Sequence, residues 1–354
     1  MEIFKFMKKE RHEQIAFYTD KSVKLRAILA IHSTALGPSL GGIRILRYKT
    51  VEEALFDLSR LSTALTLKTA AAGLNFGGGQ IVIIDSGAIE RTEALFRALG
   101  RFIESFKGRF IAAADIGVTE DYMEFVSMET KYVTGLPAYC GGSGNHSYMC
   151  AYGTLMGIIA SAKYKWGTDS IEGRKIFIQG YGRIGAYLAE FLKKKGASVT
   201  VTDRDNVKIL NAKSNGFEVF FNGNDIYSQK CDIFVPCAIG AVINTSTIGK
   251  FNCEIIAGSA NNQLLNDDDD KKLKERGILY APDFIINSGG SIDVAQEYMG
   301  YKKEKIKKKT ENIYDRLLNI FKISSEMDIS TNESAIKFAI NRINAIKGIR
   351  GMSH

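Results

Sequence analysis

The segment from Lys175–Gln179 to Asp203 constrains the fold of this chain more than any other. A short apolar run, Lys175–Gln179, is followed at once by the glycine-rich string Gly180–Gly185 and by a helical pattern over 184–195. A second apolar run, 198–202, leads directly to Asp203. A Gly-x-Gly-x-x-Gly string between a strand and a helix, with an acidic residue after the next strand, is typical of a dinucleotide-binding fold. We therefore expect a doubly wound parallel sheet of the Rossmann type.

The same segment predicts how a dinucleotide is held. Glycines permit a tight turn and close approach of a pyrophosphate, and the helix N-terminus offers free N–H groups. Asp203 would bind ribose hydroxyls and repel a 2′-phosphate, which favours NAD over NADP, whereas Arg204 could bind a 2′-phosphate and leaves that preference open. The cofactor residues predicted here are Gly180, Gly182, Arg183, Ile184, Gly185, Asp203 and Arg204.

The chain has 354 residues, too many for one ordinary core, so two domains are expected. The pattern breaks into loop chemistry near 135–150, and beyond it strands and helices alternate, as in a parallel sheet with crossover helices. We expect an α/β protein whose substrate and catalytic domain covers 1–134. A Rossmann NAD-binding domain would cover 135–329, and a C-terminal helix, 330–354, would return to the first domain. Further expected strands lie at 217–220, 232–235, 254–257 and 278–280, and helices over 292–348.

The N-terminal part predicts a mixed sheet with helices. The expected elements are strands within 12–35, a helix over 50–67 with a capping box of Thr50 and Glu53, a buried strand at 81–84, a helix over 91–106 and a strand at 110–115.

Composition removes several classes of function. No run of 18 apolar residues and no apolar signal core are present, so we expect a cytoplasmic protein without a membrane partner. The net charge is +8, but its densest basic run, 302–309, has helical spacing and no stacking aromatics, which favours a solvated helix face over nucleic-acid binding. The five cysteines form no Cys-x-x-Cys pair and the four histidines share no ligand spacing, so neither disulfides nor a metal site are expected.

Two segments of the first domain carry candidate chemistry. Gly41 and Gly42, after Leu40, predict a loop whose backbone N–H groups suit a carboxylate, and Lys68, at the start of a glycine-rich stretch, can pair with the same group. Asp115 ends an apolar strand and could carry protons. From the residues alone, Lys68 could equally be a surface lysine and Asp115 a helix cap.

Long motifs spread from about residue 10 to residue 345 resemble the Glu/Leu/Phe/Val dehydrogenase family, and its leucine dehydrogenase branch most. The matching segments are 36–44, 68–79, 114–117, 180–185, 258–263 and 281–290. The resemblance implies reversible, NAD-dependent oxidative deamination of an L-amino acid to a 2-oxo acid and ammonia, in a homo-oligomer that is a dimer or an octamer.

The resemblance also implies residue roles. Backbone around Gly41 and Gly42, with Lys68 and Asn262, would hold the substrate carboxylate, and Asp115 would carry protons. The side-chain pocket would be formed by Leu40, Ala113, Ser291 and Val294. The Gly180 turn and Asp203 would line the cofactor, together with Cys237, Ala238 and Asn262.

Gln80 stands where the resemblance implies a lysine that activates the attacking water. An amide can hold a water but cannot accept its proton, and losing a general base costs about 10²- to 10⁴-fold in rate. The chain could therefore be a slow dehydrogenase, a retired homologue that senses NAD or partners another protein, or a reductase of a preformed imine.

Ser291 is a second departure. The resemblance implies an aliphatic pocket, and a serine adds a hydroxyl and removes volume, which favours a larger or partly polar substrate side chain. Its hydroxyl could instead bond to its own helix backbone.

Overall fold

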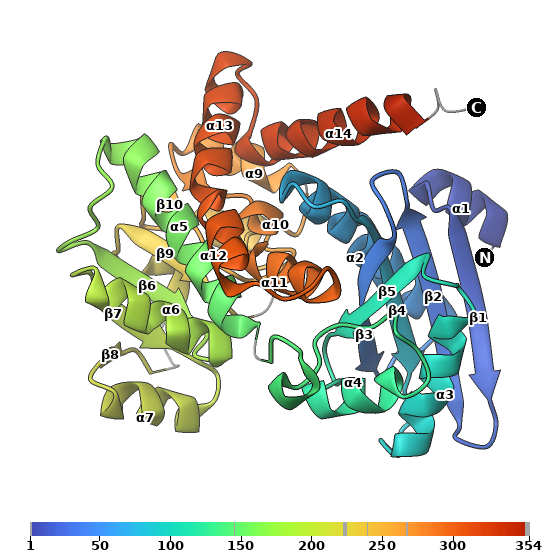
Figure 1. The fold of residues 1–354 in the computed structure, drawn as a ribbon. Coiled ribbons are helices and arrows are strands. Elements are labelled where there is room, and N and C mark those ends of the chain that lie inside the picture. The colour runs from blue at the N-terminus through green and yellow to red at the C-terminus, as the bar shows by residue number, and fades with distance from the viewer. Residues whose placement is uncertain (1, 145, 222–224, 239, 267, 351–354) are drawn as a thin grey trace. The chain divides into compact units, whose positions relative to one another are not determined.

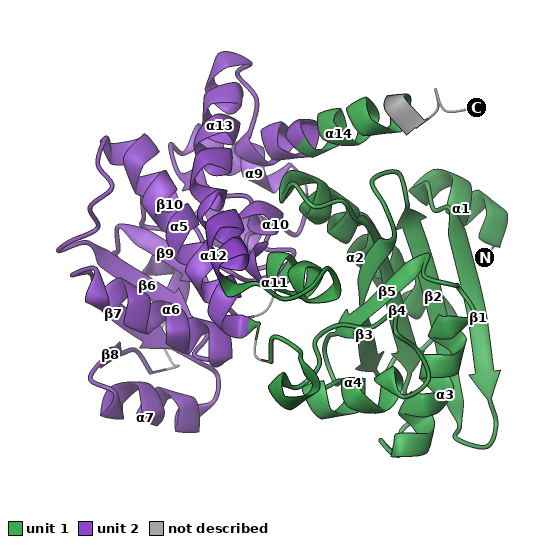
Figure 2. Ribbon diagram, viewed as in Figure 1, with its two compact units in different colours: residues 1–146, 291–303, 339–354 green, residues 147–290, 304–338 purple. Residues whose placement is uncertain are grey.

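The computed structural model describes residues 2–144, 146–221, 225–238, 240–266 and 268–350 (Figure 1). The chain divides into two compact units (Figure 2). Unit 1 comprises 1–146, 291–303 and 339–354, and unit 2 comprises 147–290 and 304–338. The division into functional domains at 134 and 329 stays a prediction.

Unit 1 contains a mixed sheet, as predicted. Its strand order is β1-β2-β4-β3-β5, antiparallel from β1 to β4 and parallel from β4 to β5. The strands are β1 (Gln14–Asp20), β2 (Leu25–Ser33), β3 (Ser39–Leu46), β4 (Gly77–Ile84) and β5 (Phe110–Ala114). The helices are α1 (Ile3–Glu10), α2 (Val51–Ala71), α3 (Glu93–Glu104), α4 (Glu120–Ser127) and, continuing from unit 2, α11 (Gly289–Tyr298).

Helices cover both faces of this sheet, which explains why the inner strand β2 is apolar and buried from Ala27 to Ile31. In β2, Leu29 and Ile31 belong to a hydrophobic cluster with buried side chains of α3 and α4. Ile28 and Ala30 belong to a second cluster, with side chains of α2, on the opposite face of the sheet (Figure 1). Alternate residues of a strand point to opposite faces, so a strand buried on both sides reads as one continuous apolar run.

The N-terminus of α2 forms half of the predicted capping box. Thr50 accepts from the backbone N–H of Glu53, but the Glu53 carboxylate accepts from Lys49 rather than from Thr50.

The prediction of a loop at Gly41 and Gly42 was wrong, because both residues lie inside β3. The strand expected at 81–84 is present but already starts at Gly77, so Gln80 is also a strand residue. The reason is packing. A Cβ on Gly41 would lie 2.2 Å from the carbonyl oxygen of Gly79, and one on Gly78 would lie 2.2 Å from the backbone nitrogen of Thr66 in α2. These glycines let strands and a helix approach closely instead of making a turn.

Unit 2 contains the predicted doubly wound sheet. Its strand order is β11-β10-β9-β6-β7-β8, and all of its pairings are parallel. From β6 the chain adds β7 and β8 on one side of the sheet, and then β9, β10 and β11 on the other side. The direction of strand addition therefore reverses between β6 and β9, and folds of this type bind ligands at that point. The strands are β6 (Lys175–Gln179), β7 (Ser198–Thr202), β8 (Glu218–Val219), β9 (Ile233–Pro236), β10 (Ile255–Ile256) and β11 (Leu279–Tyr280).

Helices connect these strands and follow them to the C-terminus. They are α5 (Ser147–Trp166), α6 (Arg183–Lys194), α7 (Asn206–Ser214), α8 (Thr245–Ile248), α9 (Asp269–Glu275), α10 (Asp283–Ile286), α12 (Lys303–Glu311), α13 (Ile313–Glu326) and α14 (Thr331–Arg350). In the last part of α14, which belongs to unit 1, the Arg342 guanidinium donates to the carbonyls of Ala70 and Leu74 at the end of α2.

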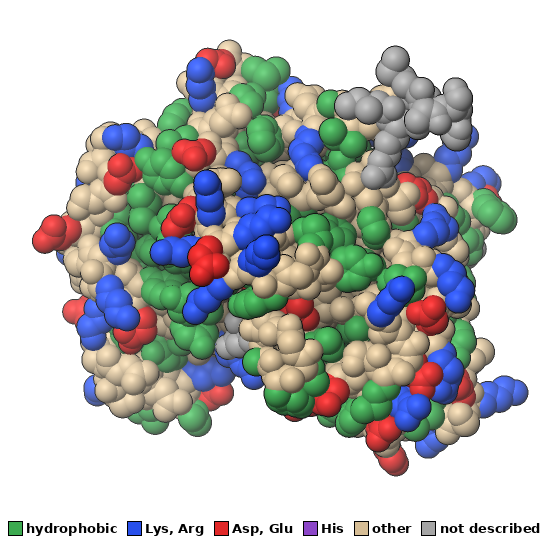
Figure 3. Space-filling model, viewed as in Figure 1, with side chains coloured by type: hydrophobic (Ala, Val, Ile, Leu, Met, Phe, Trp, Pro, Cys, Tyr) green, Lys and Arg blue, Asp and Glu red, His purple; other side chains and the backbone are tan. Residues whose placement is uncertain are grey.

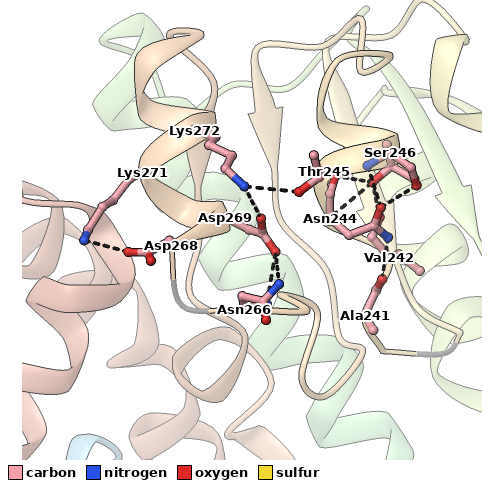
Figure 4. Close-up of polar contacts among 11 residues, drawn as sticks. Ala241, Val242, Asn244, Thr245, Ser246, Asn266, Asp268, Asp269, Lys271 and Lys272 are labelled. Atoms are coloured by element: carbon pink, nitrogen blue, oxygen red, sulfur yellow. Dashed lines mark hydrogen bonds and ion pairs between the residues drawn. The ribbon is translucent and has the colours of Figure 1, made fainter.

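The charged runs of the sequence lie on helices. Lysines of α12 gather on one face of the molecule with acidic side chains among them (Figure 3). In α9, Asp269 accepts from Lys272, which also donates to Thr245 at the start of α8, and Asp268 accepts from Lys271 (Figure 4). These carboxylates are paired with lysines of their own helix; Asp267 lies outside the described residues.

Candidate active site

Gln80 is held rigidly in the middle of unit 1. Its side chain is buried, at 1% exposure, on β4. Its Nε2 donates to Asp115 Oδ2 at 2.9 Å, and its Oε1 accepts from the backbone N–H of Gly42 at 3.0 Å. The partners fix the orientation of the amide, because only the oxygen can accept from an N–H and only the nitrogen can donate to a carboxylate. The Gly42 N–H, predicted to face a substrate carboxylate, is thus bonded to Gln80 in this structure.

The Asp115 carboxylate receives a second donor from Arg44, a residue that the sequence reasoning did not assign to the site. Arg44 Nε lies 2.9 Å from Asp115 Oδ2, and the other end of the guanidinium lies 3.4 Å from Oδ1. The arginine side chain is 12% exposed and the aspartate side chain 25% exposed. A planar guanidinium that reaches both oxygens fixes the plane of the carboxylate as well as its charge.

Arg44 is itself held from the other side by Asp57 on α2. The guanidinium donates to Asp57 at 3.2 Å, and Tyr48 donates its hydroxyl to the same carboxylate at 2.6 Å. Burial acts to lower the pKa of Arg44, but the charges of Asp115 and Asp57 outweigh it and raise that pKa. Burial and the bond to Asp57 raise the pKa of Tyr48. Arg44 therefore stays charged and Tyr48 stays a neutral donor at physiological pH.

Gly42 makes room for Asp115. A Cβ on Gly42 would lie 2.6 Å from the Asp115 Cβ and 3.2 Å from its Cγ. Gly42 pairs with Ala113 in the parallel ladder of β3 and β5, which brings the end of β5 beside it. Asp115 does not act as a helix cap with its side chain, the alternative considered from sequence, since its oxygens accept from Arg44 and Gln80.

Lys68 lies in the last turn of α2, with a side chain only 9% exposed, and is not a surface lysine. The neighbouring residue, Thr69, donates its hydroxyl to the carbonyl oxygen of Gly77 at 3.3 Å. The turn of α2 that carries Lys68 therefore packs on the strand that carries Gln80.

The four residues predicted to form the side-chain pocket lie on two strands and one helix of unit 1. Leu40 and Ala113 lie on the adjacent strands β3 and β5 and are buried. Ser291 and Val294 lie three residues apart on α11, and hence on one face of it. Val294 is buried, whereas Ser291 is partly exposed.

The glycine-rich turn of unit 2 has the geometry that a pyrophosphate needs. Gly180 has φ of 108°, which favours glycine, and a Cβ on Gly185 would lie 2.1 Å from the Gly180 carbonyl oxygen. A Cβ on Gly182 would meet no atom within 4 Å, and Gly182 is the N-cap of α6. The turn is thus tight within the protein and open at Gly182, where the N-terminal N–H groups of α6 begin. Arg183 and Ile184 are the first residues of that helix.

Two other predicted cofactor residues lie against this turn. A Cβ on Gly180 would come within 2.8 Å of the Ala238 Cβ and 3.0 Å of the Cys237 carbonyl carbon. The backbone N–H of Cys237 donates to the carbonyl of Gln179 at the end of β6. Burial raises the pKa of the Cys237 thiol, so this wall of the site is neutral.

Asp203 lies at the end of β7, beside the turn. Its carboxylate accepts from the backbone N–H groups of Tyr181 at 2.7 Å and Asp205 at 2.9 Å, while the Arg204 side chain is exposed. A cavity of about 390 Å³ opens beside Tyr181 and Gly182. Its lining consists of Tyr181, Gly182, Arg183, Ala186, Lys208, Asn211, Ser214 and Asn215. The open glycine, the helix N-terminus and the carboxylate fit an NAD molecule.

Asn262 sits in a strained backbone conformation in unit 2, with φ of 51°. Its carbonyl oxygen accepts from the N–H of Ala241 at 2.7 Å, and a Cβ on Gly240 would lie 2.7 Å from the same oxygen. A non-glycine residue keeps a left-handed conformation only where its surroundings impose it, which is frequent at functional sites.

Sequence reasoning missed Arg44, Asp57 and Tyr48. Arg44 follows Gly42 by two residues on one strand, so the two share a face, and that spacing was the available signal. Asp57 gave no signal, because a carboxylate on a helix is usually solvated.

Two general properties complete the description. Within the described part of the chain, no group of three or more His, Cys, Asp or Glu side chains could hold a metal ion. Of the helices described, none is both long and apolar enough to cross a membrane.

The chain is similar to known proteins over its full length. Residues 11–132 match the family model described as Glu/Leu/Phe/Val dehydrogenase, dimerisation domain, and residues 141–207 and 201–351 match the Glutamate/Leucine/Phenylalanine/Valine dehydrogenase model. Leucine dehydrogenase of Thermoactinomyces intermedius is 44% identical over 350 residues, which cover 99% of this chain and 96% of the relative. Phenylalanine dehydrogenase of Lysinibacillus sphaericus is 44% identical over 335 residues, covering 93% and 88%.

A solved structure shows the same similarity. The crystal structure of L-tryptophan dehydrogenase from Nostoc punctiforme superposes with a TM-score of 0.84 at 39% identity, covering 98% of this chain and 99% of the other.

Proposed function

Because this chain belongs to the Glu/Leu/Phe/Val dehydrogenase family and is, as such, an NAD-dependent amino acid dehydrogenase, we propose that it deaminates an L-amino acid with a large apolar or aromatic side chain. The product is the 2-oxo acid with ammonia, and the reaction is reversible. The observation that carries the residue roles is the partly buried Asp115 carboxylate, fixed by Arg44 and Gln80 beside a strand without side chains at Gly41 and Gly42.

In the proposed mechanism, Lys68 binds the substrate carboxylate, because a buried ammonium is suited to an anion. Asn262, in unit 2, is proposed to contact the cofactor. Gly41 and Gly42 form the wall against which the backbone of the amino acid lies. Asp115 accepts a proton from the substrate ammonium, and Arg44 keeps the aspartate in the plane required for that transfer. The Gly180–Gly185 turn, Asp203, Cys237 and Ala238 would hold NAD, which would supply the hydride acceptor of the reaction.

Gln80 is proposed to slow the hydrolytic half of the reaction. Its Nε2 has a second N–H, which can hold a water or the substrate, but the amide cannot take the proton of an attacking water. Asp115 then has to accept and donate the protons whose transfer a lysine would otherwise share. We expect substrate and cofactor to bind normally and turnover to be slow.

The substrate class follows from the relatives and from α11. The relatives named above act on leucine, phenylalanine and tryptophan. Ser291 replaces an aliphatic side chain expected from the resemblance and leaves extra volume beside Val294, which favours an aromatic over a short branched substrate. Replacing Ser291 by Val should move the kcat/KM ratio towards leucine, by about 10-fold or more for each methylene of pocket volume removed.

The test is amino-acid-dependent formation of NADH, followed by its absorbance, with a panel of L-amino acids and with 2-oxo acids plus ammonia in reverse. Gln80→Lys is assayed in parallel. Slow turnover by the natural protein and faster turnover by the variant are expected. Tight NAD binding by calorimetry with no turnover of any substrate by either form would contradict the proposal and would point to a retired, NAD-sensing homologue.

We also propose a homo-oligomer in the cytoplasm. Residues 11–132 match a dimerisation domain, and β1 lies at one end of the sheet order with Phe17 54% exposed. The cysteines are free thiols, which suits a reducing compartment. Light scattering after size exclusion should distinguish a dimer from an octamer; a monomer at assay concentration would contradict the proposal.

A further inference from the structure

Two cysteines of unit 2 lie opposite each other at the start of neighbouring parallel strands. Ile233 in β9 pairs with Ile255 in β10, and just before these strands Lys230 pairs with Asn252 in the same register. Cys231 and Cys253 follow Lys230 and Asn252 directly, so they face each other across the two strands, and the Cys231 N–H donates to the carbonyl of Asn252 at 3.2 Å.

This register meets the geometric requirement for a disulfide. Neighbouring strands lie about 4.8 Å apart, and the Cα atoms of a disulfide are usually about 4.4–6.8 Å apart. Residues directly opposite each other in a sheet point to the same face. Both side chains do belong to one apolar cluster, with Phe234, Phe251 and Ile256. The two sulfurs are therefore on the same side of the sheet.

We propose that Cys231 and Cys253 form a disulfide when the protein meets a peroxide, and that this bond reversibly fastens β9 to β10. The half-buried Cys253 thiol attacks hydrogen peroxide, forming a sulfenic acid and releasing one water. The Cys231 sulfur then attacks the sulfenic sulfur, and its proton leaves with the hydroxyl group as a second water. Two thiols and one peroxide thus give one disulfide and two waters.

The environment of the pair sets the order of these steps. Cys231 is 9% exposed, whereas Cys253 is half-buried, so peroxide reaches Cys253 more easily. The hydrogen bond with the Cys253 thiol and burial raise the pKa of Cys231. The buried Cys231 thiol therefore keeps its proton, and the more accessible Cys253 sulfur meets the oxidant first.

The bond lies at the opposite end of β9 from the cofactor residues. Cys237 and Ala238 follow the carboxyl end of this strand, and Cys231 precedes its amino end. The disulfide should therefore stabilise the sheet without altering NAD binding. It closes a loop of intermediate length, and such loops gain stability mainly by restricting the unfolded chain.

The experiment uses the full chain, reduced and then treated with hydrogen peroxide. A non-reducing peptide map should show a link between the peptides that carry Cys231 and Cys253, with loss of two hydrogens from the intact mass. The melting temperature should rise by about 5–10 °C, and dithiothreitol should reverse both changes. NAD affinity, measured by calorimetry, should not change.

Two matched variants separate this bond from other oxidation. Cys253→Ser should lose the link and the rise in melting temperature, whereas Cys140→Ser, which removes an exposed thiol of unit 1, should keep both. The peptide map of the natural protein decides the question even if Cys253→Ser folds poorly. A sulfinic or sulfonic acid at Cys253 without a link, or a link that involves Cys237, would overturn the proposal.

Discussion

Gln80 Nε2 and Arg44 Nε both lie 2.9 Å from Oδ2 of Asp115, so one carboxylate oxygen accepts from a neutral amide and from a charged guanidinium. The amide oxygen is simultaneously bonded to the backbone of Gly42. Every polar atom of the Gln80 side chain thus has a defined partner, and the residue is a fixed part of the site. A fixed neutral donor next to the proposed proton acceptor is the feature that most directly governs turnover.

Replacing Gln80 with lysine should increase the rate of the chemical step. An ammonium next to Asp115 supplies the acid–base group that the amide lacks, and kcat for NADH formation should rise about 10²-fold, with KM for the amino acid little changed. Stopped-flow and steady-state absorbance of NADH measure both. Gln80→Met, similar in length but without a titrating group, is the matched control, and an equal gain with methionine would rule out the acid–base explanation.

Gly42→Ala should disturb the site without disturbing the fold elsewhere. The new methyl group would lie 2.6 Å from the Asp115 Cβ, so the carboxylate must move, and kcat/KM should fall roughly 10- to 100-fold. Gly249→Ala, where an added Cβ meets nothing within 4 Å, is the control and should keep full activity. Unchanged activity in Gly42→Ala would mean that the position of Asp115 is not critical.

Arg44→Lys should weaken catalysis through the position of Asp115. Lysine keeps the charge but cannot reach both carboxylate oxygens, and losing a charge-assisted bond of about 1.5–3 kcal/mol should lower kcat roughly 10- to 100-fold. Because Arg44 is a positioning residue, kcat should fall while KM for the amino acid stays little changed, whereas general structural damage would alter both. Arg97→Lys, at an exposed arginine paired with Glu129 away from Asp115, is the control.

Acidification should destabilise unit 1 through His32 and His12. Burial lowers the pKa of His32 to about 4, and burial also lowers that of His12; the rings contact each other at 5.0 Å between centroids. Below about pH 6.5, His32 binds a proton in the unfolded chain but stays neutral in the folded protein. Stability is therefore full above that pH and falls as pH decreases, by roughly 3 kcal/mol for His32 by about pH 4.

Urea unfolding between about pH 7 and pH 4 measures this loss. Asp293 acts in the opposite direction, because burial raises its pKa to about 6, so its protonation stabilises the folded state over part of the same range. Comparing the natural protein with His32→Gln cancels the contribution of Asp293. A smaller acid-dependent loss is expected in the variant, and identical curves would contradict the assignment to His32.

Much of the fold followed from local pattern. The strand, glycine turn and helix from Lys175 to Lys194 were predicted close to their observed positions. This was possible because a turn and a helix cap depend on the types of residues that are adjacent in the sequence. The same local logic failed for Gly41 and Gly78. Their glycines serve contacts with residues distant in the chain, which no neighbouring residue signals.

The sequence by itself determined the parallel sheet of unit 2, the dinucleotide turn and the presence of Gln80, since each depends on residue types at short spacing. Only the tertiary structure decided that Arg44 and Gln80 meet on one oxygen of Asp115, and that Asp57 supports the arginine from behind. It also decided that Cys231 faces Cys253, through the register of β9 and β10. Such pairings come from the packing of strands and helices far apart in sequence, which follows from burial of the whole core rather than from any local preference.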